Sequence, residues 1–332
     1  MKRIITMISV LLMALLLTGC AAVPADPENG EPGYASCATD LATDGQRVFL
    51  LRRGKTLPSW SSTYTAYEVT GGAMRRISGG RNADDFAVAD GTLHIASHTV
   101  NWLKPVRDSA ELDGYRMDGG STLHVSARDE SHVNPDWYAF HIAGERLIRQ
   151  RTFTVSGGMR WQEFAFVDAQ GNAGEPFCAL PFVGARVTDT YIISADYKGD
   201  EIRLFDLSRM REHVLPELWG RDEFDQAVLP RGVLLEGTLY YCAEDGVHAF
   251  TPDSLQDSLF APVTAPEYFY VTGGRLYTVA DDGLLTAFDL STGEAAPTGV
   301  ALTKADRYVI AGENAYIAVD GGCRIAPLTE VE

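Results

Sequence analysis

A repeated pair of short β-hairpins constrains the fold of this chain more than any other feature of its sequence. The segment "LYTVADDGLLTAFDLSTGE", residues 276–294, places two β-rich runs around Asp-Asp-Gly and ends in Ser-Thr-Gly-Glu. Related segments carry an aromatic residue in an apolar strand that precedes a polar turn, at Tyr67, Phe140, Phe166, Phe205, Phe250 and Phe288. An alternating strand, a Gly- or Asp-containing turn and a second strand predict a tight hairpin.

A further hairpin precedes most of these segments, so the repeating unit contains four strands. Its turns lie near Gly45, Gly91, Gly157, Asp189, Gly237, Gly273 and Gly312. The last three turns recur at roughly 40 residues, a spacing typical of propeller blades. One such unit alone would expose an apolar face, and stacking units around an axis buries it. We therefore predict an all-β fold, a β-propeller of four-stranded blades, in preference to paired β-sandwiches or an irregular β-solenoid.

The seven turns predict seven blades. The long interval between Gly91 and Gly157 contains "YRMDGGSTLHVSA", residues 115–127, which is either an insertion or the start of an eighth blade. The C-terminal unit supplies only three strands. We expect "GYASCATD", residues 33–40, to provide an N-terminal strand that completes this last blade and closes the ring, which would leave no exposed sheet edge there.

The N-terminus resembles a bacterial lipobox. Two basic residues and an apolar run lead into Leu-Thr-Gly-Cys, in which Cys20 would carry a diacylglyceryl thioether and further acyl chains such as palmitate. We therefore predict a lipoprotein signal peptide over residues 1–19, a lipidated Cys20 with a flexible Pro-, Gly- and acid-rich tether over 20–35, and the propeller over 36–332. The alternative is an ordinary cleaved signal peptide in which Cys20 has no special role.

This N-terminus predicts an extracytoplasmic protein that is anchored to the cell membrane through the lipid on Cys20. The residue after Cys20 is Ala21, so this position lacks the acidic residue that is associated with retention in the inner membrane. If the host is Gram-negative, this favours anchoring in the outer membrane. The chain is 45% hydrophobic, which is enough for a large core, and its net charge is -17. Such an acidic body repels phosphate backbones, so we expect no nucleic-acid partner, and we expect a monomer.

Four cysteines remain besides Cys20, in a compartment that permits disulfides. Ring closure would bring Cys37 and Cys323 into neighbouring strands of one blade, which makes them the best candidates for a disulfide. The alternative is that no cysteine is bonded. We expect Cys178 and Cys242 to be buried free thiols, and no Cys/His grouping predicts a metal or redox site.

One blade resembles the repeat of quinoprotein-like (PQQ-like) β-propellers. In "TAFDLSTGE", Ala287, Asp289, Thr292 and Gly293 match the Ala-x-Asp-x-x-Thr-Gly-x-x-x-Trp docking pattern of quinoprotein alcohol dehydrogenases, but Pro297 occupies the tryptophan position. The chain also lacks the adjacent cysteines of those enzymes. Together with the lipobox, the resemblance implies an extracytoplasmic propeller lipoprotein. The resemblance implies the propeller fold but not the binding of a quinone cofactor. We therefore expect no cofactor.

Residues that could perform chemistry are scattered along the sequence. An acidic group is a candidate for calcium binding, although its spacing matches no known cation loop; it comprises Asp108, Glu111, Asp113 and Asp118. A second group could serve a glycan-cleaving site and comprises Asp129, Glu130, His132 and Asp136 beside Trp137. The isolated histidines His94, His124 and His141 fit structural roles in strands. No residue is therefore assigned a catalytic, cofactor-binding or metal-binding role.

Aromatic residues of the connecting segments are candidates for recognition, because loops on a rigid scaffold commonly carry function. They are Trp60, Tyr64, Trp102 and Trp219. The alternative is that these rings cover seams between blades. We therefore expect a binding or scaffold protein for a protein or glycan partner. The alternative is a cell-envelope glycosidase or lyase with its site at the propeller axis.

Overall fold

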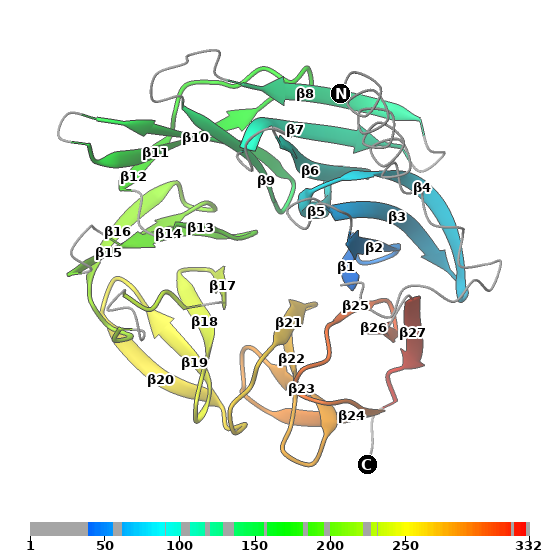
Figure 1. Cartoon of the computed structure of the whole chain (residues 1–332). Helices are drawn as coiled ribbons and strands as arrows, with labels where there is room; N and C mark the ends of the chain where they lie inside the picture. The colour runs from blue at the N-terminus through cyan, green and yellow to red at the C-terminus, as the bar shows by residue number, and fades with distance from the viewer. Residues whose placement is uncertain are drawn as a thin grey trace, which may run out of the picture.

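The computed structural model describes residues 39–329 apart from short gaps, which are residues 56–61, 90, 101–106, 117–119, 129–135, 156–157, 182–184, 196–199, 222–226, 231 and 320–321. The part of the chain that is described contains strands and no helix. These strands form seven antiparallel sheets arranged as blades around a central axis (Figure 1). The predicted all-β propeller with seven blades is therefore confirmed.

Each blade uses consecutive strands in chain order, with the first strand innermost. Blade 1 contains β1 (Thr39–Thr43), β2 (Val48–Lys55), β3 (Ser62–Thr70) and β4 (Ala73–Arg81). Blade 2 contains β5 (Ala83–Ala89), β6 (Thr92–Val100), β7 (Arg107–Tyr115) and β8 (Ser121–Ala127). Blade 3 contains β9 (Trp137–Ala143), β10 (Arg146–Thr154), β11 (Arg160–Val167) and β12 (Cys178–Pro181).

The remaining blades follow the same plan. Blade 4 contains β13 (Arg186–Val187), β14 (Tyr191–Ala195), β15 (Glu201–Asp206) and β16 (Arg211–Pro216). Blade 5 contains β17 (Gly232–Leu235), β18 (Thr238–Ala243), β19 (Gly246–Thr251) and β20 (Gln256–Ala261). Blade 6 contains β21 (Phe269–Thr272), β22 (Arg275–Val279), β23 (Leu284–Asp289) and β24 (Ala295–Ala301). Blade 7 contains β25 (Tyr308–Ala311), β26 (Asn314–Val319) and β27 (Gly322–Pro327).

The hydrophobic core is a ring of blade-to-blade interfaces. One buried apolar cluster joins each pair of adjacent blades, as when Tyr191 and Ile193 of blade 4 pack with Leu239 and Phe250 of blade 5. Strand β14 is buried along its whole length because neighbouring blades cover both of its faces. Each blade therefore depends on its neighbours for burial of its apolar surface, as the repeat predicts.

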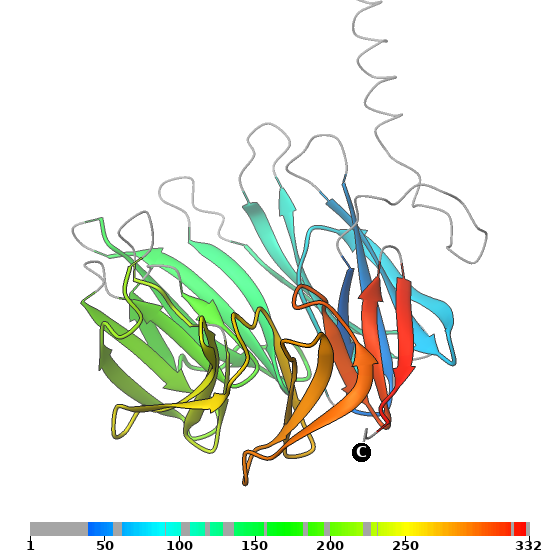
Figure 2. The same ribbon diagram turned by 90° about the horizontal axis from the view of Figure 1, so that it is seen from below.

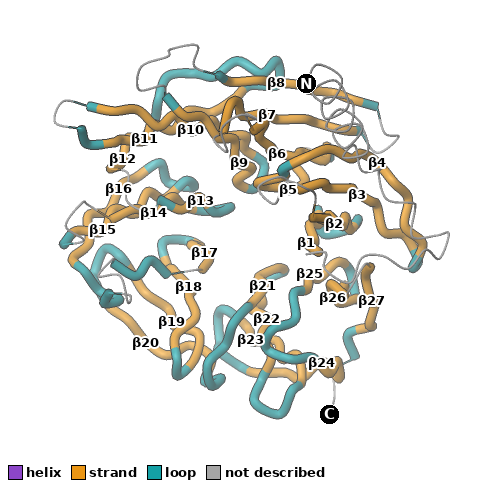
Figure 3. The backbone as a smooth tube through the Cα atoms, in the orientation of Figure 1, coloured by secondary structure: helices purple, strands orange, loops and turns teal. Residues whose placement is uncertain are grey.

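The first and last blades lie side by side and complete the ring (Figure 3). The backbone N–H of Gly312 in the β25–β26 turn donates to the carbonyl oxygen of Gly45 in the β1–β2 turn, at 3.1 Å. Both glycines have positive φ, 56° and 88°, a backbone conformation that favours glycine. Seen from the side, the strands run roughly along the direction of the axis (Figure 2).

Aspartates of the repeat build its polar turns. The Oδ1 atom of Asp289 accepts hydrogen bonds from the backbone N–H groups of Ser291 and Thr292, at 2.8 and 3.0 Å. Together with the Ser291 hydroxyl, these bonds lower the pKa of Asp289 to about 2. Asp206 of blade 4 makes the same contacts to Ser208 and Arg209. The recurring Phe-Asp-Leu-Ser sequence thus specifies one turn geometry.

The structure differs from the predicted blade layout in three details. The first hairpin of blade 3 turns at Gly144, between β9 and β10, and residue 157 instead lies between β10 and β11, outside the described residues. The "YRMDGGSTLHVSA" segment forms the outer hairpin of blade 2, so it is neither an insertion nor an eighth blade. Of "GYASCATD", Thr39 and Asp40 begin β1, which pairs with β2 in blade 1. Residues 33–38 lie outside the described residues, so closure of blade 7 by an N-terminal strand stays a prediction.

Candidate functional site

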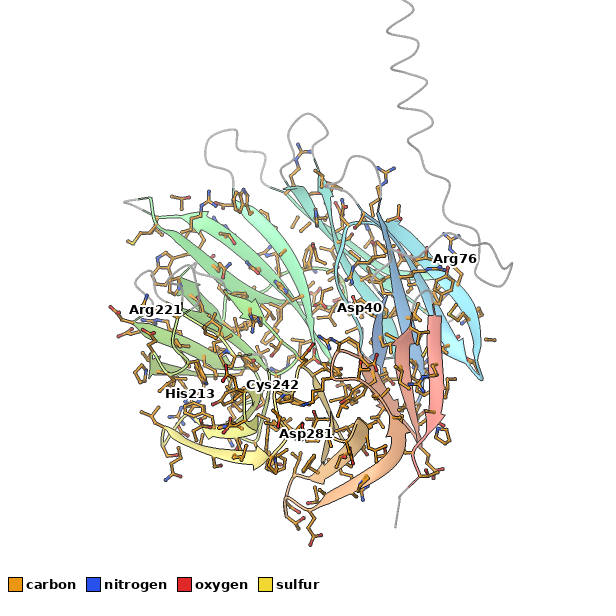
Figure 4. The ribbon with its side chains drawn as sticks, turned by 60° about the horizontal axis from the view of Figure 1, so that its bottom comes forward. Asp40, Arg76, His213, Arg221, Cys242 and Asp281 are labelled. Carbon is orange, nitrogen blue, oxygen red and sulfur yellow. The ribbon has the colours of Figure 1, made fainter. Side chains whose placement is uncertain are left out.

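The innermost strands surround an axial channel. A cavity of about 680 Å³ runs along it and has walls from β1, β5, β13, β17 and β21. A smaller cavity of about 260 Å³ adjoins it between blades 1, 2, 6 and 7. The two cavities share Leu41, Asp85, Phe86, Tyr268, Arg307 and Val309. Figure 4 shows Asp40 and Cys242 near the middle of the ring, which is where these cavities lie.

Hydrogen bonds between neighbouring blades hold the channel walls in place. Asp85 of blade 2 accepts the backbone N–H of Ile142 in blade 3, at 2.9 Å from Oδ2. The hydroxyl of Tyr268 in blade 6 donates to the carbonyl oxygen of Tyr308 in blade 7, at 2.9 Å. The hydroxyl of Tyr308 donates in turn to the carbonyl oxygen of Tyr277 in blade 6, also at 2.9 Å. These side chains therefore combine a structural role with a place in or beside the channel wall.

Charged groups line the smaller cavity. Arg53 forms an ion pair with Asp40 and donates from Nε to the carbonyl oxygen of Ala83, at 3.3 Å. Burial lowers the pKa of Arg53, and the negative charges of Asp84 and Asp85 oppose this shift. A guanidinium remains protonated at physiological pH in proteins. The cavity therefore presents both charge signs in fixed positions.

An exposed arginine and an aromatic ring meet beside these groups. The guanidinium carbon of Arg307 lies 5.1 Å from the centre of the Tyr268 ring, which is within the range of cation–π contacts. Arg307 also donates to the carbonyl oxygen of Ala305, at 3.1 Å. Because the guanidinium carries five N–H donors, it retains donors for a ligand.

Asp189 lies in the turn between β13 and β14 and is exposed to the channel. The enclosing walls disfavour its charged form, and the nearby charge of Asp85 adds to this effect. Together they raise the pKa of Asp189 to about 6, although a hydrogen bond from the Gly144 backbone N–H opposes the shift. Burial and the charge of Asp189 also raise the pKa of Tyr270 to about 12. The pKa of Asp189 therefore depends on Asp85 of blade 2, and Asp189 in turn affects Tyr270 of blade 6 across the channel.

Cys242 contributes a thiol to the channel wall from β18. Burial raises its pKa to about 11, and the positive charge of Arg307 opposes this shift. Since the thiolate is the nucleophilic form, Cys242 is unreactive at neutral pH. Cys178 is a buried free thiol, as expected, whereas Cys242 is free but half-buried. Cys37 lies outside the described residues, so its pairing with Cys323 stays a prediction.

The described members of the two predicted acidic groups bond neighbouring side chains within their blades. Glu111 and Asp113 lie on β7 in blade 2, where His124 bonds Asp113 at 2.8 Å. Residue 118 and the side chain of residue 108 lie outside the described structure. In the second group, residues 129–135 are not described, and Asp136 forms an ion pair with Arg151 at 2.6 Å. Within the described residues, no group of three His, Cys, Asp or Glu side chains is placed to hold a metal ion.

The two described aromatic candidates pack between blades. Tyr64 is buried in the interface of blades 1 and 2. Trp219 is half-buried and makes edge-on contacts with Tyr241 and Phe250 of blade 5, at centroid distances of 5.8 and 5.5 Å. Both rings therefore cover seams, which is the alternative that the sequence left open. Residues 60 and 102 lie outside the described residues.

Sequence reasoning missed the residues that form the channel. Asp85, Asp189, Tyr268, Tyr270 and Arg307 come from four different blades, and no local motif connects them. One local signal was available, because "EYFYV", residues 267–271, places a glutamate and three aromatic rings at the start of an innermost strand. Once the innermost strand of each blade is known, a run of aromatic residues at its start indicates side chains that line the axial channel.

The fold and site together define an all-β propeller with a charged, tyrosine-lined axial channel. No protein-family model matches the chain. A search of curated proteins also finds no match. No helix among the described residues is both long and apolar enough to cross a membrane.

Several solved structures resemble this one over most of its length. The computationally designed Ika8 protein is 11% identical, with a TM-score of 0.48, and the match covers 89% of this chain and 97% of that one. BamB from Moraxella catarrhalis is 11% identical, with a TM-score of 0.42 and 90% coverage of both chains. Sqt1 from Saccharomyces cerevisiae is 7% identical, with a TM-score of 0.46, and the match covers 91% of this chain and 97% of that one. These low values carry no conclusion about function.

Proposed function

We propose that this protein is a lipid-anchored extracytoplasmic binding protein, and that the axial channel takes part of a protein or glycan partner. The observation that carries the proposal is the convergence of Arg307, Tyr268, Tyr270 and Asp189 on one cavity. The cavity is concave, and Tyr268 and Asp189 are held by hydrogen bonds to neighbouring blades. A preformed concave site with a few fixed polar groups is the usual form of a ligand site.

The geometry of individual groups supports recognition. Arg307 offers donors beside an aromatic face, and Asp189 offers acceptor positions. The hydroxyl of Tyr270 makes no hydrogen bond within the described residues and lines the same cavity. Because the blades fix these groups in advance, a ligand would order few side chains on binding, which reduces the entropic cost of association.

The second candidate function is a cell-envelope glycosidase or lyase. It is favoured by Asp85 and Asp189, whose charges interact in the channel and of which Asp189 has a pKa near 6. A pair of carboxyl groups, one of them with a raised pKa, is the usual acid and base of glycoside cleavage. Both carboxyl groups, however, accept backbone N–H groups of blade 3, which gives each a structural role.

One experiment separates the two functions. The purified mature domain would be assayed for binding to glycan and protein fractions of the cell envelope, and for turnover of glycosides, polyuronides and peptidoglycan fragments. We expect binding without turnover, and we expect Tyr270→Phe and Arg307→Ala to weaken that binding. Arg211→Ala on the outer strand of blade 4 is the matched control and should bind normally. Turnover that Asp189→Asn abolishes would instead support the enzyme.

A further inference from the structure

A separate cavity of about 320 Å³ lies between blades 1 and 2. Its walls come from β3 and β4 on one side and from β6 and β7 on the other, and it shares no lining residue with the axial channel. Nothing in the function proposed above uses it. It is therefore a second candidate site, and its chemistry can be examined independently.

The interface around this cavity changes from apolar to polar with distance from the core. Deep in the interface, side chains such as Phe49 and Ile95 are fully buried. On the blade 2 side a hydrogen-bonded network continues outward. Its bonds join Thr99 to Ser109 at 2.8 Å, Ser109 to Glu111 at 2.6 Å, Ser126 to Glu111 at 3.1 Å and His124 to Asp113 at 2.8 Å. The seam between these two blades thus combines an apolar core with an outer polar network.

Two tyrosines line the cavity. The hydroxyls of Tyr64 and Tyr115 are hydrogen-bonded to each other, and Tyr115 also bonds Ser78. Burial is the main reason that both pKa values are raised, so both hydroxyls are neutral. A side chain at Gly80 would bring its Cβ within 2.8 Å of the Tyr64 hydroxyl. The glycine therefore allows the Tyr64 ring to lie against β4, with its hydroxyl beside the cavity.

A serine hydroxyl in the wall is available to a ligand. Ser97 lines the cavity, and its hydroxyl makes no hydrogen bond within the described residues. A serine hydroxyl can donate one hydrogen bond and accept others. A ligand hydroxyl in the cavity could therefore bond Ser97 without displacing a protein partner.

The charges around the cavity indicate a neutral ligand. Asp113 and the neighbouring Glu111 are acidic, and Arg81 in the wall is basic. A hydrogen bond to Asp113 raises the pKa of His124 beside the cavity. The wall therefore offers hydroxyls, a carboxylate acceptor and a guanidinium without a strong excess of either charge.

We infer that this cavity binds one hydroxyl-rich ring, a neutral monosaccharide unit of a glycan. Ser97, Tyr64 and Tyr115 exchange hydrogen bonds with ring hydroxyls, and Asp113 accepts from them. The site adds a carbohydrate contact at the rim of the propeller, away from the axis. It requires no contribution from the axial channel.

The test is ligand-observed NMR with glucose, galactose and N-acetylglucosamine as probes, on the purified mature domain. We expect at least one probe to bind, and we expect Ser97→Ala and Asp113→Asn each to weaken its affinity by about tenfold, the typical effect of losing one good hydrogen bond. Ser258→Ala, at an exposed serine of blade 5, is the matched control and should bind as the unaltered protein does. Thermal unfolding of each variant shows whether it remains folded.

The possible outcomes separate this cavity from the channel. Binding that survives Asp189→Asn and is weakened by Ser97→Ala supports the inference and leaves the channel proposal untouched. Binding that Asp189→Asn abolishes and Ser97→Ala leaves unchanged places the sugar in the channel and overturns it. Absence of binding for all three probes at tens of millimolar, a range in which weak sugar sites are normally detected, also overturns it.

Discussion

At the scale of single residues, aspartates stabilise local turns at some positions and line the axial channel at others. Asp206 and Asp289 act locally, because each accepts backbone N–H groups two and three residues further along the chain. This role can be read from the repeat, since Asp-x-Ser favours such a turn. Asp85 and Asp189 instead accept N–H groups of another blade. Their role depends on the ring, so local sequence does not reveal it.

The raised pKa of Asp189 predicts a pH-dependent contribution to stability. Between the ordinary aspartate pKa and about 6, the folded state retains a proton that the unfolded state has lost. The free energy of unfolding therefore falls as the pH rises through this range. Asp189→Asn removes the titration while retaining an acceptor for the Gly144 N–H. We expect the variant to gain stability relative to the unaltered protein between pH 4 and pH 7.

Thermal or urea unfolding at both pH values measures this difference. Groups that do not interact with Asp189 also titrate in this range, but their contributions are common to both proteins and cancel in the comparison. Glu175→Gln, at an exposed position that makes no hydrogen bond or ion pair within the described residues, serves as a control and should differ from the unaltered protein equally at both pH values. A stability difference for Asp189→Asn that is equal at pH 4 and pH 7 would contradict the assigned environment.

At the scale of strands and blades, most of the architecture follows from the sequence. Turn residues and alternating strands identify the hairpins, and the repeat identifies the propeller. The exception is blade 3, whose first hairpin turns at Gly144. The segment around Gly144 resembles the second hairpin of other blades, because Phe140 occupies the aromatic position of the repeat. Hairpins of similar pattern cannot be ordered within a blade by local sequence alone.

Blade 7 differs from the others because its described part has three strands, with β27 at the outer edge. In every other blade the fourth strand is followed in the chain by the first strand of the next blade. Residues 33–38 precede β1 in the chain, which is the corresponding position for blade 7. Cys323 lies on β27 and packs with the cluster between blades 7 and 1. We therefore retain the proposal that Cys37 and Cys323 form a disulfide.

Such a bond would constrain nearly the whole chain and would contribute roughly 2–5 kcal/mol to stability. Non-reducing peptide mapping of protein isolated from the envelope should recover one peptide pair that joins the two cysteines. Cys178 and Cys242 are internal controls and should be recovered as free thiols. Recovery of Cys37 and Cys323 as free thiols under the same conditions would reject the disulfide.

At the scale of the whole molecule, the predicted lipid anchor and the proposed recognition site belong to different parts of the chain. The predicted lipid on Cys20 supplies membrane affinity, at about 0.8 kcal/mol for each buried methylene. Cys20→Ala should therefore release a folded protein from the membrane fraction, which cell fractionation and immunoblotting would show. Retention of this variant in membranes washed with high salt and mild alkali would contradict the lipid anchor.

The channel could not be predicted because it exists only when the ring is complete. Its walls combine the start of β5, the β13–β14 turn, and the segments around β21 and the start of β25, which are far apart in sequence. Composition alone also gives little guidance, since a net charge of -17 does not reveal that three arginines line the axis. The topology that brings the innermost strands together is what defines the site.

The central claim is that the partner is recognised at the axial channel, and site-specific photo-crosslinking tests it most directly. A benzophenone side chain would replace Glu267, an exposed residue that lines the channel, or Val214, an exposed residue on the outer strand of blade 4. Irradiation of cells that produce the full-length protein should yield a specific adduct from position 267 and none from position 214. Adducts from position 214 alone, or none from position 267, would contradict recognition at the axis.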